Sequence, residues 1–376
     1  MSLQLIVINL AHYFKTMLRA VTFSVSIILL TLSLSASAQL KVSPTHSSLH
    51  YMGRIINEKD SATILSWPGS SVTIKFKGTG LKAILKDEKN QNYYHVIIDG
   101  KIVPLKPDTL KREYVLASNL AFGLHTVQLF KKTEWEWGKT WLYGFEVIEG
   151  KKLKNIKAPK RRIEFYGNSI TCGYGALDYS GRDSGAPEFE DNYITYDAIT
   201  ARHFNADYNC IAKSGIGVLV SWFPLIMSEM YDRLDATTPD RKWDFSTYKP
   251  QIVVINLFQN DSWIVEKKDH PEFKHRFGES RPTPDTIIKH YQNLVKNIRG
   301  KYPKAHIICA LGNMDATQKG SPWPGYIESA VSNLKDAKIY THFFPYKNTP
   351  GHPKVEEQKA MADDLIAFIE NKRLWD

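Results

Sequence analysis

Four residues spread over the second half of the chain could together carry out acyl transfer by a serine. Ser169 follows the apolar segment 163–167 in a Gly-x-Ser turn, so we expect its hydroxyl at the carboxyl end of a strand and at the start of a helix. Gly215, Asn260 and His352 each follow a later predicted strand. Serine acyl transfer needs a nucleophile, a base and hydrogen-bond donors for an oxyanion. These four residues therefore form the candidate site.

The elements that must position these residues begin after Arg162. Apolar strands alternate there with helices, which predicts βαβ units and a three-layer α/β fold with a parallel sheet. The predicted strands are IEFYG, YNCIA, IVVINL, HIICALG and KIYTHFF, and the predicted helices span residues 193–204, 284–299, 326–334 and 353–371. In such a sheet ligands bind beyond the carboxyl ends of the strands.

A different pattern precedes this region. From Ala62 to about Gly150 the chain consists of short alternating segments with no convincing helix, which predicts a β-sandwich or jelly roll. The Asp99-Gly100 pair predicts a tight hairpin turn. Because 376 residues exceed the usual size of one hydrophobic core, we expect two domains. The jelly roll is placed at residues 39–152 and the α/β domain at residues 153–376.

The first 38 residues have the pattern of a secretory signal peptide. Lys15 and Arg19 precede an apolar run, and Ala36-Ser37-Ala38 forms a small-residue cleavage site. A single membrane anchor is the alternative, but the apolar run is short and contains serines. The chain is therefore expected to be secreted or periplasmic, without stable membrane insertion after cleavage.

Charge and cysteine content limit the possible functions further. The formal net charge is +10, but the densest basic run, residues 151–162, lacks aromatic residues and fits a linker better than a nucleic-acid site. Cys172, Cys210 and Cys309 have no zinc-ligand spacing, so buried free thiols are expected, with one disulfide in an oxidising compartment as the alternative. The acidic, Gly/Pro/Ser-rich segment 178–191 is interpreted as a solvated rim of the cleft rather than a metal site.

The order of the motifs carries a family resemblance. Gly-x-Ser, a glycine, Asn-Asp and His-Pro before a final helix resemble the SGNH (GDSL-type) hydrolases from Ile163 to the C-terminus. With an N-terminal jelly roll and LHTVQLFKKTEWEWG beside GNSITCGYG, the chain is similar to carbohydrate esterase family two, the acetyl xylan esterase type. The resemblance implies removal of acetyl groups from polysaccharides, with no metal or organic cofactor.

The resemblance also implies a role for each candidate. Ser169 would be the nucleophile and His352 the general base, while the N–H groups of Ser169 and Gly215 and the Asn260 amide would form the oxyanion hole. Gly217 is an alternative to Gly215. Asp261 is expected to support its loop.

Two positions depart from the family pattern. Asn168 replaces the aspartate of Gly-Asp-Ser, and a short polar side chain should still bond the local backbone. Thr349 occupies the position, three before the histidine, where many relatives carry an aspartate. The resemblance to dyad-type members of this esterase family implies that a main-chain carbonyl could orient His352 in a Ser-His dyad. Asp363 and Asp364 lie about three helical turns further on, which places them out of reach.

The sugar-binding part of the site is less defined by sequence. Trp263 is the best placed aromatic platform for a pyranose, with Trp222 and Trp323 as alternatives, and core packing explains each of them as well. The first domain could bind glycan or brace the cleft. Two other functions remain open, a carbohydrate-binding protein that has lost catalysis and an esterase for lipids or thioesters.

Overall fold

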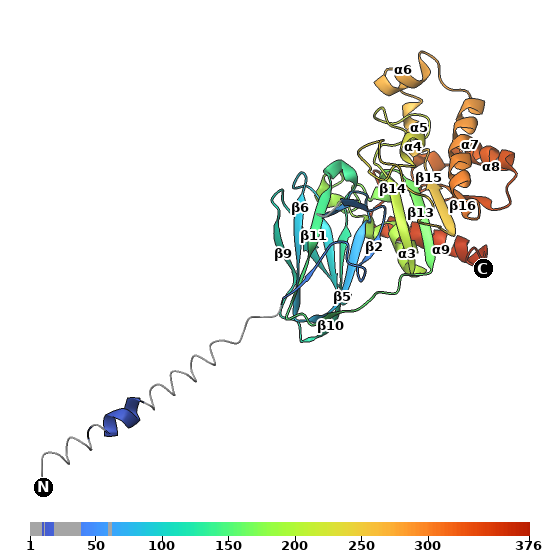
Figure 1. The fold of residues 1–376 in the computed structure, drawn as a ribbon. Coiled ribbons are helices and arrows are strands. Elements are labelled where there is room, and N and C mark those ends of the chain that lie inside the picture. Colours follow the sequence, from blue (N-terminus) through green and yellow to red (C-terminus); the bar gives the residue numbers. More distant parts are fainter. Residues whose placement is uncertain (1–9, 11, 19–38, 59–61) are drawn as a thin grey trace, which may run out of the picture.

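The structure is a computed structural model, and it describes residues 10, 12–18, 39–58 and 62–376. The predicted cleavage site after Ala38 lies outside these residues, as does most of the segment 1–38. No helix among the described residues combines the length and the apolar character needed to cross a membrane. The chain from residue 40 onwards forms two parts, an N-terminal β-rich part and a C-terminal α/β part, that lie side by side (Figure 1).

The N-terminal part is the predicted β-sandwich. One antiparallel sheet has the order β3 (Ile56–Glu58), β4 (Ala62–Leu65), β11 (Thr140–Ile148), β6 (Gly80–Asp87) and β9 (Arg112–Ala117), with β1 (Leu40–Val42) on β11. The other has the order β12 (Lys152–Leu153), β5 (Ser71–Gly78), β10 (Gly123–Lys131), β7 (Tyr94–Ile98) and β8 (Lys101–Leu105), with β2 (His50–Met52) on β5. Alternate residues of the long strands, such as Phe76, Leu85 and Leu129, pack into one core between the sheets.

The predicted hairpin turn is confirmed. Asp99 and Gly100 have φ angles of 47° and 88° and join β7 to β8. Positive φ at both central residues is the geometry that matches the twist of the flanking strands. Strand β8 itself was not predicted, because it is a mostly exposed edge strand containing Pro104 and lacks a buried alternating face.

The C-terminal part confirms the predicted three-layer α/β fold. Its parallel sheet has the order β14 (Ala206–Ala212), β13 (Arg161–Gly167), β15 (Ile252–Asn256), β16 (His306–Leu311) and β17 (Ile339–Phe343). Helices α3 (Tyr196–His203) and α9 (Val355–Asn371) pack on one face, while α7 (Pro284–Lys301) and α8 (Trp323–Leu334) pack on the other (Figure 1). The three cysteines lie in this part, buried and unpaired as expected.

Short helices and turns connect these elements. They are α2 (Ser169–Cys172), α4 (Met227–Met230), α5 (Gln259–Ile264), α6 (Pro271–Phe277) and the turns η1 (Trp135–Trp137), η2 (Pro187–Phe189), η3 (Asn192–Ile194) and η4 (Asp315–Thr317). Helix ends follow local chemistry. Helix α7 begins at Pro284 because Pro suits the first helical position and Thr283 caps the Thr286 N–H at 3.2 Å.

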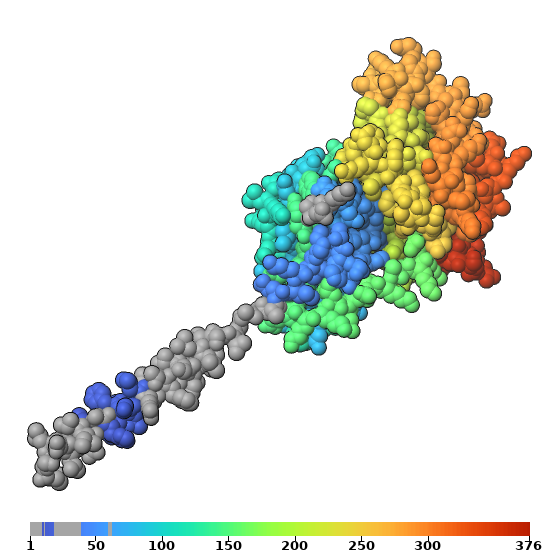
Figure 2. Space-filling model, viewed as in Figure 1, coloured from blue at the N-terminus to red at the C-terminus, as the bar shows by residue number. Residues whose placement is uncertain are grey.

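Arg54 anchors the sandwich to the α/β part. Its buried guanidinium donates to the carbonyls of Tyr231 and Arg233, each at 2.7 Å, and to Glu164 Oε1 at 3.0 Å. Figure 2 shows the blue segment of about residues 39–58 packed directly against the yellow segment that holds these carbonyls. A buried charge that lost its partner would be strongly unfavourable. The sandwich is therefore fixed to β13, the strand that leads to Ser169.

Candidate active site

Ser169 is presented by a tight turn between β13 and α2. Asn168 is the N-cap, and its side-chain oxygen accepts the Ile170 N–H at 3.0 Å, so the turn keeps its cap without the family aspartate, as expected. A Cβ at Gly167 would lie 1.9 Å from Thr171 Oγ1, which explains the glycine there. Because Asn168 rather than Ser169 caps the helix, the Ser169 hydroxyl is free to face the cleft.

The structure brings Ser169 together with His352 and, beyond it, a carboxylate. His352 Nε2 lies 2.8 Å from Ser169 Oγ, and His352 Nδ1 lies 2.7 Å from Asp183 Oδ2. The other oxygen of Asp183 accepts the backbone N–H of His352 at 2.8 Å. A proton on Nδ1 directed at the carboxylate leaves Nε2 as the acceptor for the serine hydroxyl. The three groups have the arrangement that activates a serine nucleophile.

Asp183 corrects the expectation of a dyad oriented by a main-chain carbonyl. The carboxylate comes from the segment 178–191, which was interpreted as a solvated rim. Thr349 does not take this role, because its hydroxyl bonds instead to the side chains of Lys347 and Glu357. Asp363 and Asp364 pair with side chains on α9 and β17, which agrees with their expected lack of reach.

Local chemistry folds the segment so that Asp183 reaches His352. Asp178 accepts the N–H groups of Ser180 at 2.9 Å and Ser184 at 2.6 Å, and these bonds close the loop around Asp183. Gly351 has a φ of 71°, and a Cβ there would lie 2.8 Å from Asp183 Cγ. The glycine before His352 therefore permits the close approach of the carboxylate.

The electrostatics of Asp183 favour its charged form. Partial burial alone would raise the pKa of its carboxyl, but the hydrogen bonds and charge of His352, with the Lys354 ammonium 3.4 Å away, hold that pKa well below its ordinary value. The carboxylate thus stays ionised at neutral pH. It can stabilise a positive charge that develops on the imidazole during proton transfer.

Three candidate oxyanion donors belong to residues that line the cleft. In the described part of the chain the backbone N–H groups of Ser169 and Gly215 have no hydrogen-bond acceptor. The Asn260 amide gives one hydrogen to the Ile216 carbonyl at 2.8 Å, and its oxygen accepts from Trp222 Nε1 at 3.1 Å. These two bonds orient the amide and leave its second hydrogen for a ligand. All three residues line the same cleft as His352.

Gly217 and Asp261, which the sequence offered near these donors, have other roles in the structure. Gly217 gives its N–H to Ser221 Oγ at 2.9 Å, so it is not free as Gly215 is. Asp261 accepts the N–H groups of residues 218–220 and supports that loop, a structural role of the kind expected. Burial raises the pKa of Asp261 to about 6, while these N–H groups pull it down.

The cleft that contains these residues has a volume of about 850 Å³. Trp263 lines it, and its Nε1 donates to Asp315 Oδ2 at 2.7 Å, which fixes the indole. Trp222 also lines it but serves as the donor to Asn260, whereas Trp323 is buried in the core. Within the described ranges no group of three or more His, Cys, Asp or Glu side chains is arranged to hold a metal ion.

The sandwich contributes one wall of the cleft through residues that sequence reasoning did not single out as site residues. Glu134, Glu136 and Trp137 come from the loop between β10 and β11 and line the cleft together with Ser214 and Gly215. Their only sequence signal was the motif TEWEWG. The candidate site thus lies between the two parts of the molecule.

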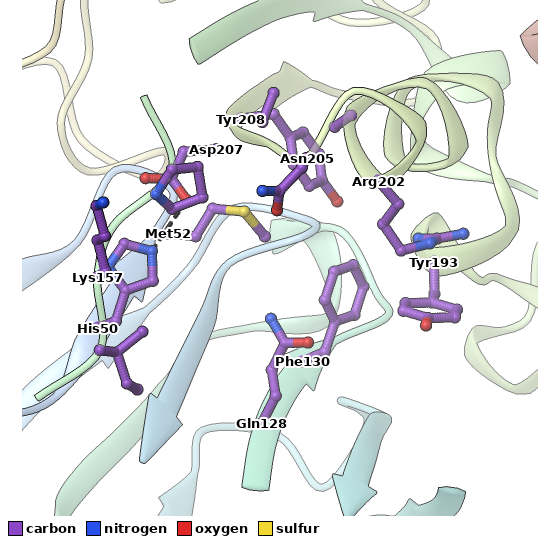
Figure 3. Close-up of a pocket in the computed structure, with 14 residues that line it drawn as sticks. His50, Met52, Gln128, Phe130, Lys157, Tyr193, Arg202, Asn205, Asp207 and Tyr208 are labelled. Carbon is purple, nitrogen blue, oxygen red and sulfur yellow. Dashed lines mark hydrogen bonds and ion pairs between the residues drawn. The ribbon is translucent and has the colours of Figure 1, made fainter. Parts of the chain in front are cut away.

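A separate crevice of about 310 Å³ lies elsewhere at the junction of the two parts (Figure 3). The ion pair between His50 and Asp207, with a 2.9 Å separation, spans it, and Arg202 stacks 3.8 Å above the ring of Tyr193 at its edge (Figure 3). None of the predicted site residues lines this crevice. The chemistry therefore belongs to the cleft that contains Ser169.

Comparison with known proteins found relatives among the carbohydrate esterases. The family model described as carbohydrate esterase 2 N-terminal matches residues 51–156. A solved family two carbohydrate esterase from Clostridium thermocellum, in complex with cellohexaose, is 34% identical, with 87% of this chain and 100% of that chain covered and a TM-score of 0.78.

Two curated proteins are also similar. Cellulase/esterase CelE of Acetivibrio thermocellus is 34% identical over 86% of this chain, which spans 39% of the length of that protein. An acetylxylan esterase / glucomannan deacetylase of Cellvibrio japonicus is 27% identical, with 92% of this chain and 96% of that protein covered.

Proposed function

The chain belongs to carbohydrate esterase family two, and from this membership we propose that it removes acetyl groups from polysaccharides through an acyl-enzyme intermediate on Ser169. The observation that carries the proposal is the hydrogen-bonded series of Ser169, His352 and Asp183 in an open cleft. No metal or organic cofactor takes part in the proposed steps.

Acylation begins when the Ser169 hydroxyl gives its proton to His352 Nε2 as Oγ attacks the acetyl carbonyl carbon. The carbonyl oxygen becomes an oxyanion, which accepts hydrogen bonds from the N–H groups of Ser169 and Gly215 and from the Asn260 amide. The imidazolium then protonates the sugar oxygen as its bond to the acyl carbon breaks. The sugar hydroxyl leaves, and the acetyl group remains on Ser169.

Deacylation repeats these steps with water as the nucleophile. His352 takes a proton from the water, the oxyanion forms again in the same hole, and acetate leaves as Ser169 recovers its proton. Asp183 remains ionised throughout and holds the proton on Nδ1. It is the residue that keeps the imidazole in the tautomer both half-reactions need.

This arrangement favours catalysis over the carbohydrate-binding alternative. That alternative was motivated by Asn168 and Thr349, the two departures from the family pattern. Asn168 still caps the turn, and Asp183 supplies the carboxylate that Thr349 lacks. A protein that only bound glycan would have no need for an oriented imidazole beside a serine with free oxyanion donors.

The first test is acetate release from acetylated xylan, mannan and glucomannan. We expect release from at least one of them, because the cleft combines the serine site with aromatic side chains such as Trp263 and Phe223 that suit pyranose rings. The same polymers after saponification serve as the control. No release from any polymer, together with no labelling by a serine-directed fluorophosphonate, would leave the binding alternative as the better explanation.

We also infer that the chain is exported, because its first 38 residues have the signal-peptide pattern. Exported protein is expected to begin at Gln39, which N-terminal sequencing or mass spectrometry of the secreted or periplasmic fraction measures. A full-length chain retained in the membrane fraction would contradict this expectation.

A further inference from the structure

We propose that Glu134, a residue of the β-sandwich, positions the oxyanion hole. It does so by accepting the backbone N–H of Ser214, the residue before Gly215. This proposal deepens the proposed esterase function and rests on it. It gives the N-terminal part an indirect role in the catalytic step. Glu134 would be a positioning residue, because its contact is with the protein and not with the substrate.

The central contact joins the two parts of the molecule. Glu134 Oε2 accepts the backbone N–H of Ser214 at 3.0 Å. Ser214 is joined to Gly215 by the peptide bond that carries the free oxyanion N–H. Gly215 has a φ of 83°, and glycine adopts many backbone conformations. The direction of its N–H therefore depends on the contacts that hold the flanking peptides.

The neighbours of Glu134 in the loop contact the side chain of the adjacent residue, Lys213. Glu136 forms an ion pair with the ammonium of Lys213, and the ring of Trp135 lies 4.3 Å from that ammonium. Residues 134–136 of the sandwich loop therefore each contact residue 213 or residue 214. On the other side, the Gly215 carbonyl accepts the backbone N–H of Trp222 at 3.1 Å. The oxyanion peptide is therefore held from both sides, and on one side the support comes from the sandwich.

The loop that carries Glu134 is itself rigid. Glu134 is 2% exposed, and its backbone N–H donates to Glu190 Oε1. The buried Lys131 ammonium donates to the carbonyls of Thr133 at 2.6 Å and Glu134 at 3.1 Å. Trp137 Nε1 donates to the second oxygen of Glu190 at 2.8 Å. These bonds fix the backbone of the loop at Glu134, so its side chain is suited to hold the Ser214 N–H in one orientation.

This rigidity matters because oxyanion donors act through preorganisation. The loss of one donor typically lowers kcat by about 10²- to 10³-fold, and a displaced donor loses part of that effect. We therefore expect Glu134→Ala to lower kcat for p-nitrophenyl acetate by about 10- to 100-fold with KM within about twofold. Glu134→Gln, whose amide oxygen can still accept the Ser214 N–H, should retain most of the activity.

A second measurement separates positioning from a general loss of stability. A boronic acid forms a tetrahedral adduct with the serine and places an oxygen in the oxyanion hole, so its inhibition constant should rise in Glu134→Ala in parallel with the fall in kcat/KM. Asp99→Ala is the matched control, because Asp99 accepts the Thr126 N–H at 2.8 Å at a hairpin of the same sandwich. It should leave kcat and the boronate inhibition constant unchanged.

The outcomes are distinguishable. If Glu134→Ala keeps the wild-type kcat and boronate inhibition, or loses activity only in proportion to the folded fraction, the proposal is overturned. If the alanine variant does not fold, Glu134→Asp decides, because its shorter side chain withdraws the acceptor from the Ser214 N–H. In Glu134→Asp a loss of about two- to tenfold that is matched by the boronate supports positioning, and wild-type values for both overturn it. A wild-type protein without esterase activity would instead contradict the proposed function itself.

Discussion

Replacing Ser169 by alanine is expected to lower the rate of acetyl ester hydrolysis by about 10⁴- to 10⁶-fold, the largest effect of any single change in this chain. The hydroxyl is the atom to which the acetyl group would be bonded, so the oxyanion donors and His352 have nothing to act on without it. Initial rates with p-nitrophenyl acetate measure the loss, and labelling by a fluorophosphonate should disappear with it.

The fold should be unaffected, because the only side-chain partner of Ser169 Oγ among the described residues is His352. Ser332→Ala, on the exposed side of α8, is the matched control and should keep wild-type rates. Substantial activity in Ser169→Ala would contradict the assignment and direct attention to Ser214, a second serine that lines the cleft.

The main elements of the fold could be predicted because their patterns are local. Strands β13 to β16 are apolar runs covered on both faces, and the sandwich strands alternate buried and exposed residues. Helix α7 has an unambiguous start at Thr283 and Pro284. The edge strand β8 and the short helices α4 to α6 have no such pattern, and they were missed.

The candidate residues Ser169, Gly215, Asn260 and His352 could be selected because each follows a predicted strand, and the parallel sheet places those ends together. The carboxylate of Asp183, which contacts His352, could not be selected in this way. The segment 178–191 contains several acidic residues in an irregular loop, and nothing local distinguishes the one that reaches residue 352.

In the structure these acids have different roles. Asp178 closes the loop, Asp183 holds the imidazole, Glu190 binds the sandwich loop at Trp137, and Asp191 lies 2.7 Å from the imidazole of His95. The segment therefore connects the sandwich with His352, and it also lines the cleft through Asp183, Gly185 and Ala186. Its importance depends on long-range contacts that a single sequence does not display.

The change Asp183→Asn is expected to lower kcat by about 10³- to 10⁴-fold while the fold remains intact. An amide N–H in place of the carboxylate would donate to His352 Nδ1, which forces the proton onto Nε2. An imidazole in that tautomer cannot accept the Ser169 proton. Asp363→Asn, which removes a carboxylate from an exposed pair on α9, is the matched control and should leave kcat unchanged.

The pH dependence sharpens this test. Because the pKa of Asp183 lies well below its ordinary value, the wild-type carboxylate stays charged from pH 5 to pH 9, so its own titration does not limit activity in that range. The asparagine variant should therefore be slow at every pH in this range, with no pH at which the two rates converge. A variant within tenfold of wild type would show that Ser169 and His352 work as a dyad. The Asp183 carboxylate would then serve mainly to fix the loop 178–191 and not to set the tautomer of His352.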